Sequence, residues 1–511
     1  MGLFAGPAAA AEAVAPDARF NDPSPEGLFA GGKRLREFLE DTGLSDVFVV
    51  RELLRSLDLG KLLEKYPGGG RPAYHPAAML GLILFGLIRG ARSTRCLEKL
   101  ARSDLQCWWL TGGLMPDHSV IARFINRHAD ELSGPLFESL TRQVLERTGS
   151  DPTDLAGDGT VIQAVASRLD VIRQDVAAKE AKAARIRAEE SPGVKSFQAD
   201  AERAENVAEV AAERAANRGS KRGKDKGNTR INRHEPEAVN QKLKGGQLAP
   251  SYKPTVLANA DKIVIANQVH GSSETAQVEP LLDQAQRVSD KQPIKRVRFD
   301  AGFFSIAVFA LGVARDLDLL VSEVRTASAK RPTPVASAQY DKSKFKYDEA
   351  SDTYTCPEGQ RLVRKDSDRQ RALARYGGAP CAQCPKRSEC TDAKEGRTIK
   401  RYEGEELSEA MRVVMEHPLA RAAYRQRAAM VEPVFADFQQ RLGFSRLLRR
   451  GLRGARLEVS LASMAHNLNR MLDLRRRGRV PDQTPSQFCL DSWRHSPSLA
   501  TPWPWRSRCA A

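Results

Sequence analysis

Leu155-Ala156-Gly157-Asp158-Gly159-Thr160 is an apolar run that ends in an acidic residue between two glycines. The pattern predicts a short buried strand with Asp158 at its carboxyl end. Val297-Arg298-Phe299-Asp300 repeats the pattern and is followed by Ala301-Gly302. Because ligands bind at the carboxyl ends of neighbouring strands in α/β sheets, we expect Asp158 and Asp300 to lie close together. Taken singly, each could instead be a turn residue, since Asp and Gly are both common in turns.

A third acidic residue, Glu432, lies in a segment with helical periodicity. Apolar side chains recur there at alternating spacings of four and three residues: Tyr424, Ala428, Val431, Phe435, Phe438 and Leu442. Glu432 borders this stripe and is expected at the boundary of the core. Pro433 lacks a backbone donor, which predicts a bend or a restart of the helix. Glu432 could also be no more than an ion-pair partner of Arg425 or Arg427. Three converging carboxylates can hold two Mg²⁺ ions for attack on a phosphodiester.

The segments around these residues predict an α/β architecture. Strand patterns cover residues 255–259, 262–269, 296–300 and 317–322, helix patterns cover 275–288 and 304–314, and long helices are expected in 402–441 and 457–474. This order is typical of a mixed sheet flanked by helices. The apolar run from Ala77 to Ile88 is too short to cross a membrane and predicts a buried helix in an all-helical N-terminal region.

Shifts in composition divide the chain into segments. We expect a flexible tail at 1–45, a helical domain at 46–150, an α/β catalytic domain at 151–475 and an irregular tail at 476–511. Two inserts interrupt the catalytic domain: a helical hairpin with a basic loop at 167–235 and a cysteine-rich segment at 335–400. The hairpin could be an antiparallel coiled coil or only a solvated decoration.

The chain carries a net charge of +16 and has a pI near 9.5. This charge favours a polyanionic partner, and nucleic acid is the first candidate because Lys and Arg contacts to phosphates supply most non-specific affinity. The alternative is a protein that is simply rich in arginine. No membrane-spanning run or secretory signal is recognisable, so we expect a cytoplasmic protein with reduced cysteines.

Half of the eight cysteines fall in one segment: Cys356, Cys381, Cys384 and Cys390. Four thiolates that include one Cys-x-x-Cys can form a tetrahedral site for structural Zn²⁺. Reduced, unliganded cysteines are the alternative. The others, Cys96, Cys107, Cys489 and Cys509, are scattered and suggest no site.

Together these motifs resemble the DDE transposases of bacterial insertion sequences, most strongly the cut-and-paste group with a Tyr-x-x-Arg…Glu signature. The resemblance is carried by Gly157-Asp158-Gly159-Thr160, by Phe299-Asp300-Ala301-Gly302-Phe303-Phe304-Ser305, by Tyr424-Arg425-Gln426-Arg427 with Val431-Glu432-Pro433-Val434-Phe435, by Leu442-Gly443-Phe444-Ser445-Arg446, by Arg450-Gly451-Leu452 and by Ala465-His466-Asn467-Leu468. Gly70-Arg71-Pro72 through Pro116-Asp117-His118-Ser119 looks like the family's helical N-terminal domain, for DNA binding or dimerisation.

The resemblance implies an RNase H-like catalytic core in which Asp158, Asp300 and Glu432 bind two Mg²⁺ ions, with Mn²⁺ as a possible substitute. It also implies binding to the terminal inverted repeats of a mobile element, strand cleavage there, and strand transfer to double-stranded target DNA. The active complex would be a homodimer or a higher oligomer, located with the nucleoid in the bacterial cytoplasm.

The same resemblance implies DNA contacts by Tyr424, Arg427, Gln439, Arg441 and Arg446. The family usually has Lys seven residues after the catalytic Glu, where this chain has Gln439. Glutamine can hydrogen-bond a phosphate but carries no charge, and neighbouring Arg441 is the candidate to supply it. Two alternatives stay open: an inactive DNA-binding derivative, and a metal-dependent nuclease without strand transfer.

Overall fold

The computed structural model describes residues 17–217, 229–290, 292–323, 340–368, 372–393 and 395–478. Its main sheet has the order β11 (Val264–His270), β10 (Leu248–Asn259), β5 (Asp154–Gly159), β12 (Arg296–Phe299) and β13 (Asp318–Val321). β12 is parallel to β5 and β13, whereas β10 is antiparallel to β5 and β11. The short strands β6 (Ile162–Gln163) and β9 (Val239–Lys242) pair with the first half of β10.

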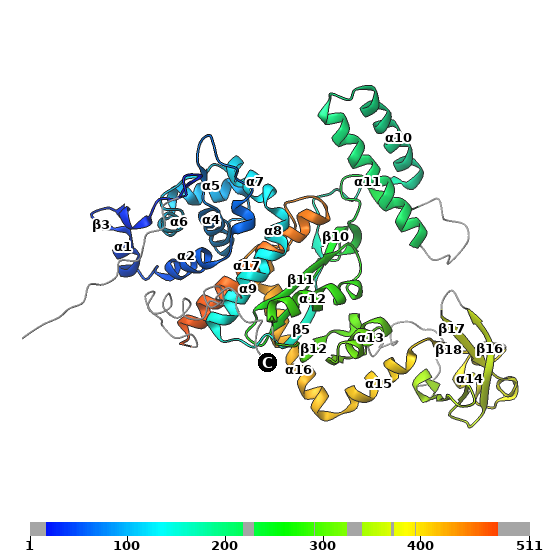
Figure 1. Ribbon diagram of the computed structural model, residues 1–511. Coiled ribbons are helices and arrows are strands. Elements are labelled where there is room, and N and C mark those ends of the chain that lie inside the picture. Colours follow the sequence, from blue (N-terminus) through cyan, green and yellow to red (C-terminus); the bar gives the residue numbers. More distant parts are fainter. Residues whose placement is uncertain are drawn as a thin grey trace, which may run out of the picture.

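The predicted mixed sheet flanked by helices is confirmed (Figure 1). The flanking helices are α12 (Val278–Ser289), α13 (Ile306–Ala314), α15 (Glu405–Glu416), α16 (Pro418–Gln440) and α17 (Gly451–Arg476). The 402–441 stretch forms two helices, because Pro418 occupies the first position of a new one, where its missing donor costs nothing.

Of the bend or restart expected at Pro433, the restart is wrong, because α16 continues through this residue. A proline inside a helix costs about 3 kcal/mol or more. The buried side chains of Val431, Val434 and Phe438 on either side of Pro433 hold the helix against the body of the protein and offset that cost.

The N-terminal region is mainly helical, as predicted. Its helices are α1 (Leu35–Asp41), α2 (Asp46–Ser56), α3 (Gly60–Leu63), α4 (Pro76–Ile88), α5 (Thr94–Ser103), α6 (Leu105–Thr111), α7 (His118–Arg127), α8 (Ala129–Ser133) and α9 (Pro135–Thr148). Residues 17–45, expected as part of a flexible tail, instead form α1 and the short strands β1 (Phe20–Asn21), β2 (Phe29–Ala30) and β3 (Lys33–Arg34), with β1 pairing β4 (Ala73–Tyr74). The physical reason is burial, since Phe20, Leu35 and Leu39 are packed into the core.

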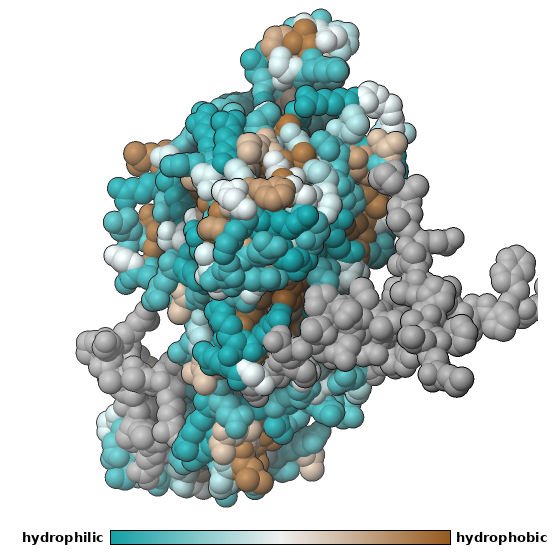
Figure 2. Space-filling model, turned by 90° about the vertical axis from the view of Figure 1, so that its left-hand side faces the viewer, coloured by the Kyte–Doolittle hydropathy of each residue, from teal (hydrophilic) through white to brown (hydrophobic). Residues whose placement is uncertain are grey.

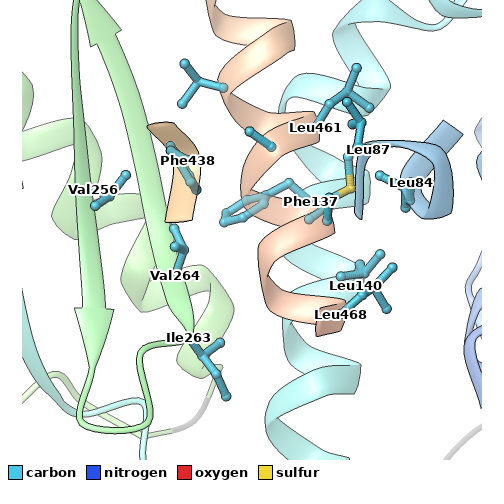
Figure 3. Close-up of a cluster of buried hydrophobic side chains, with 14 of the residues drawn as sticks. Leu84, Leu87, Phe137, Leu140, Val256, Ile263, Val264, Phe438, Leu461 and Leu468 are labelled. Atoms are coloured by element: carbon cyan, nitrogen blue, oxygen red, sulfur yellow. The ribbon is translucent and has the colours of Figure 1, made fainter. Parts of the chain in front are cut away.

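One hydrophobic core joins the N-terminal helices to the sheet through α17 (Figure 3). It includes Leu84 and Leu87 of α4, Phe137 and Leu140 of α9, Leu461 and Leu468 of α17, Phe438 of α16, and Val256, Ile263 and Val264 from β10 to β11. Burying each of these side chains stabilises the fold by about 1.5–3 kcal/mol. The sheet and the N-terminal helices are therefore packed as one body.

Both inserts project from this body (Figure 1). The first is the predicted helical hairpin, α10 (Gln174–Glu190) and α11 (Lys195–Asn217), with β7 (Val171–Arg173) paired to β8 (Arg230–Asn232) at its base. Most of the expected basic loop, residues 218–228, lies outside the described residues. The second insert is a sheet of β14 (Lys346–Asp348), β15 (Thr353–Thr355), β16 (Arg361–Asp368), β17 (Leu373–Gly377) and β18 (Ile399–Tyr402), with α14 (Arg387–Cys390).

The surface seen in Figure 2 is mainly hydrophilic, and its hydrophobic residues form separate groups. Within the described ranges, every helix is too short or too polar to cross a bilayer. Of the predicted segments, 1–16 and 479–511 lie outside the description, and Cys489 and Cys509 lie there with them.

Candidate active site

Asp158 and Asp300 leave neighbouring parallel strands at the same edge of the sheet. Phe299 stands opposite Gly157 in the register of β12 and β5, so the next residue on each strand is acidic. Gly157 is required there, because a Cβ at this position would lie 2.2 Å from the Phe299 ring. The expected approach of the two carboxylates is therefore a direct consequence of strand register.

Local hydrogen bonds orient both carboxylates. Asp158 Oδ1 accepts from the backbone N–H of Gly159 at 2.8 Å, and Asp300 Oδ1 accepts from that of Gly302 at 3.0 Å. Burial raises the pKa of Asp158 above its ordinary value; Arg427 opposes the shift and the charge of Asp300 adds to it. The two aspartates thus interact electrostatically at the sheet edge.

Helix α16 brings the third carboxylate to this edge through Arg427. Arg427 Nη1 lies 3.3 Å from Asp158 Oδ2, and its Nη2 lies 3.8 Å from Glu432 Oε1. The Glu432 side chain is 62% exposed, whereas that of Asp158 is 19% exposed. The ion pair that the sequence left open for Glu432 is formed with Arg427, and it links Glu432 to Asp158.

Tyr424 lies on α16 three residues before Arg427. Burial raises the pKa of its hydroxyl, Arg427 lowers it, and the charge of Asp300 raises it further. Tyr424 is therefore near enough to both charged groups to feel them, and it is half-buried as a member of the apolar stripe.

The donor set fits Mg²⁺, which prefers carboxylate oxygens. Within the described part of the chain, however, no three His, Cys, Asp or Glu side chains are gathered closely enough to hold an ion. Arg427 stands between two of the three carboxylates. Binding of a divalent cation by Asp158, Asp300 and Glu432 therefore requires Arg427 to withdraw and Glu432 to move inward.

Glu274 is a fourth carboxylate at this edge, and sequence reasoning missed it. A Cβ on Gly159 would lie 2.7 Å from Glu274 Oε1, and a Cβ on Gly302 would lie 3.2 Å from its Oε2. The two glycines that follow the aspartates thus leave room for this side chain. Lys253 Nζ pairs with Glu274 Oε1 at 3.3 Å. The position of Glu274 in the sequence was an available signal. It follows β11, which runs in the same direction as β5, so both strands end toward the same edge of the sheet.

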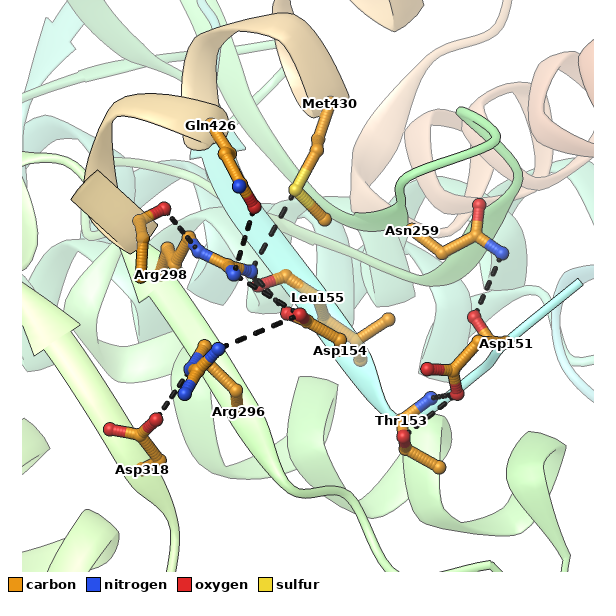
Figure 4. A network of polar contacts seen from close by, with 11 residues as sticks. Asp151, Thr153, Asp154, Leu155, Asn259, Arg296, Arg298, Asp318, Gln426 and Met430 are labelled. Carbon is orange, nitrogen blue, oxygen red and sulfur yellow. Dashed lines mark hydrogen bonds and ion pairs between the residues drawn. The ribbon is translucent and has the colours of Figure 1, made fainter. Parts of the chain in front are cut away.

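A buried arginine ties α16 to the sheet (Figure 4). The Arg298 side chain is 1% exposed and forms an ion pair with Asp154 of β5. Its Nε donates to the backbone carbonyl of Ala423 at 2.7 Å, and its Nη2 donates to Gln426 Oε1 at 3.5 Å. These acceptors adjoin Tyr424 and Arg427 in sequence, so Arg298 positions the helix turn that carries them. An arginine between Val297 and Phe299 in a buried strand was the available signal.

The remaining predicted DNA contacts do not share one environment. Nε and Nη2 of the Arg441 guanidinium donate to the Asp437 carboxylate, which also pairs with His466 Nδ1. Gln439 Oε1 accepts from Lys244 Nζ at 2.9 Å. Arg446 is exposed, and its carbonyl accepts from Arg92 Nη2 at 2.8 Å, which attaches its loop to the N-terminal helices. The charge of Arg441 is thus compensated by Asp437.

The four clustered cysteines line one cavity of about 20 Å³. The backbone N–H of Gln360 donates to Cys356 Sγ at 3.2 Å. Burial raises the pKa of the Cys390 thiol, Arg397 opposes the shift, and Cys381, Cys356 and Cys384 add to it. The structure therefore brings together four thiols that span 35 positions of the sequence, from Cys356 to Cys390.

Two family models match the chain. The model described as "Transposase DDE domain" matches residues 355–472, which include Glu432, the DNA-contact candidates on and after α16, and the four clustered cysteines. The model described as "Transposase domain (DUF772)" matches residues 39–127 in the N-terminal helices. Asp158 and Asp300 lie outside both matched segments. No curated protein matches the chain. The two matches, both to segments described as transposase domains, indicate an insertion-sequence transposase.

Proposed function

We propose that this protein binds the terminal inverted repeats of an insertion sequence and catalyses divalent-metal-dependent DNA cleavage and strand transfer. The observation that carries the proposal is that Asp158 and Asp300 follow paired positions of two neighbouring strands, while Arg427 links Asp158 to Glu432 of α16. The sheet order β11-β10-β5-β12-β13, in which β10 is antiparallel to its neighbours, supports an RNase H-like core.

In this proposal Asp158, Asp300 and Glu432 hold two Mg²⁺ ions, or Mn²⁺ in their place. The ions supply activation of the attacking oxygen and stabilisation of the leaving oxygen. The strand register sets the separation of the two aspartates, and α16 carries Glu432. Arg427 neutralises Asp158 and Glu432 before the cation binds and then has its guanidinium available for a DNA phosphate.

Double-stranded DNA is the substrate, at both the element ends and the target. The net charge of +16 supports this partner. We include in the proposal a dimer or higher oligomer as the active complex, with the N-terminal helices as the DNA-binding or dimerisation unit. A cytoplasmic location with the nucleoid follows from the substrate.

The test incubates the full chain with DNA that carries the repeats flanking its gene and with an unrelated target duplex. We expect nicked or excised ends and joined products with Mg²⁺ or Mn²⁺, and neither product in EDTA. Salt-dependent binding without strand breakage under either metal would instead establish the inactive derivative. Cleavage without joined products would establish the nuclease.

Glu274→Gln tests the fourth carboxylate. This change retains size and hydrogen bonding but removes the charge beside Gly159 and Gly302. Because partners that surround metal ligands typically contribute 10–100-fold, we expect cleavage to fall by about that factor and the Mg²⁺ requirement to rise. The matched control is Glu279→Gln. Glu279 lies on α12 and forms an exposed ion pair with Arg315, so this variant should cleave like the parent. Parental cleavage by Glu274→Gln would exclude Glu274 from the site.

We also propose that Cys356, Cys381, Cys384 and Cys390 draw together around one structural Zn²⁺, since no three of these thiols are close enough to hold an ion in the present arrangement. The cavity that these cysteines line is large enough for about one ion or one water molecule. The surrounding sheet, β14–β18, has a small core of Phe345, Tyr354, Leu362, Tyr376 and Ile399, and a segment of this size usually needs such a staple. Gly396, at φ +90°, is also fitted to the cluster, because a Cβ there would lie 2.3 Å from Cys381 Cβ.

Elemental analysis of the purified chain checks this site. We expect about one zinc per chain, and loss of amide-exchange protection in β14–β18 after chelation, because zinc binding is coupled to folding. Cys384→Ser should lower the zinc content, whereas Cys96→Ser, on exposed α5, should not. A chain that remains free of zinc after reconstitution, with β14–β18 protected, would favour the reduced, unliganded cysteines.

A further inference from the structure

We propose that Lys244 supplies the phosphate-binding cation on the Glu432 face of α16, next to the active site. This inference rests on the proposed function and deepens it, because it identifies where a DNA strand crosses the catalytic helix. The cation comes from the turn between β9 and β10, a segment for which the sequence predicted no functional residue.

The first step is the helix face. Gln439 follows Glu432 by seven residues, two turns of α16, so both side chains lie on one side of the helix, together with Arg425 one repeat earlier. Gln439 is uncharged and would give a phosphate only a neutral hydrogen bond. Its amide oxygen instead accepts from Lys244 Nζ at 2.9 Å. An ammonium group therefore stands at the Gln439 position.

The second step is the backbone that places Lys244. Lys242 pairs with Leu248 at the last register position of β9 and β10. The turn is closed by hydrogen bonds from Leu243 N to Gln247 O at 2.8 Å and from Gly246 N to Leu243 O at 2.9 Å, with Gly246 at φ +83°. β10 then runs on to the residues paired with Asp158 and its neighbours. One continuous strand thus connects the Lys244 turn to the catalytic edge.

The third step is charge. Asp437 neutralises Arg441, and Asp158 and Glu432 neutralise Arg427. The Lys244 side chain is exposed, and among the described residues its contact is with a neutral amide, which leaves its charge uncompensated there. Such a cation gains most from a DNA phosphate, whose neutralisation releases a condensed counterion. The chemistry therefore fits the backbone of the strand that enters the active site, and the contact is independent of base sequence.

The experiment measures binding and cleavage of element-end DNA between 50 and 200 mM salt for the parent and three variants. Lys244→Ala should weaken binding, lower the salt slope by about one, and show an affinity deficit about 3-fold larger at 50 mM than at 200 mM salt. Lys244→Ala combined with Gln439→Lys returns a cation to the same place and should restore both properties. Lys179→Ala removes an exposed charge from α10 and serves as the matched control.

A parental salt slope and affinity in Lys244→Ala would overturn the inference, and so would failure of Gln439→Lys to rescue it. Thermal melting of each variant excludes misfolding as the cause, since Lys244 is exposed and in a turn. If the parent itself neither binds nor cleaves element ends, the proposed function fails. If the parent cleaves and the Lys244 variants match it, only the inference about Lys244 fails.

Discussion

Asp158→Asn and Asp300→Asn are each expected to lower cleavage of element ends by at least about 10³-fold, which corresponds to about 4 kcal/mol of transition-state stabilisation. Asparagine is chosen because its side-chain oxygen can still accept from Gly159 N or Gly302 N, the bonds that hold each aspartate in place. The fold and the strand register should therefore survive. What is lost is one negative charge and one carboxylate oxygen at a site that needs both for a divalent cation.

Single-turnover cleavage in Mg²⁺, with DNA binding measured separately, checks this expectation. Binding should be retained, because removing a carboxylate near phosphates does not weaken their attraction to the protein. Asp283→Asn, on α12 and paired with Arg315, is the control for loss of an aspartate and should cleave like the parent. Near-parental cleavage by either active-site variant would remove that residue from the catalytic set.

Arg298→Met is expected to destabilise the protein by about 3 kcal/mol and to reduce cleavage in the protein that remains folded. Breaking a buried ion pair usually costs about 3–5 kcal/mol, because the partner is left uncompensated. The lower end applies here, since the Asp154 side chain is 37% exposed and keeps Arg296 at 3.9 Å. The substitution also leaves the carbonyl of Ala423 without its donor.

The cleavage rate of Arg298→Met shows whether Arg298 positions α16 or only stabilises the fold. Without Arg298, the turn of α16 that carries Tyr424 and Arg427 loses its attachment to β5 and β12. At a temperature where the variant is folded, we therefore expect the cleavage rate at saturating DNA to fall. The DNA concentration that gives half of this rate should change little. Arg298→Lys should recover part of the stability and less of the rate, because lysine keeps the charge but lacks the guanidinium fork.

Arg296→Met is the matched control for Arg298. It lies two residues earlier on β12, is 37% exposed, and pairs with Asp318 at the surface. Exposed pairs are worth about 0–1 kcal/mol, so this variant should melt and cleave nearly like the parent. Equal losses in the two arginine variants would contradict the assignment of Arg298 as the residue that anchors α16.

Much of the fold followed from local patterns. The strands ending at Asp158 and Asp300 and the stripe on α16 were readable because apolar periodicity and strand-end glycines depend on neighbouring residues alone. Pro433 misled, because its local cost is outweighed by packing on both sides of it. The supposed tail misled as well, since its composition does not reveal that Leu35 and Leu39 have a core to enter.

By itself, the sequence determined the strand ends that carry two of the acidic residues, the helix that carries the third, and the cysteine-rich segment. Only the tertiary structure decided what stands between and beside them: Arg427 linking Asp158 to Glu432, Glu274 filling the space over two glycines, and Lys244 reaching Gln439 across 195 residues of chain. The reason is physical. A periodic pattern records which face of an element is buried, but a contact between distant side chains depends on register and packing that are settled only when the chain has folded.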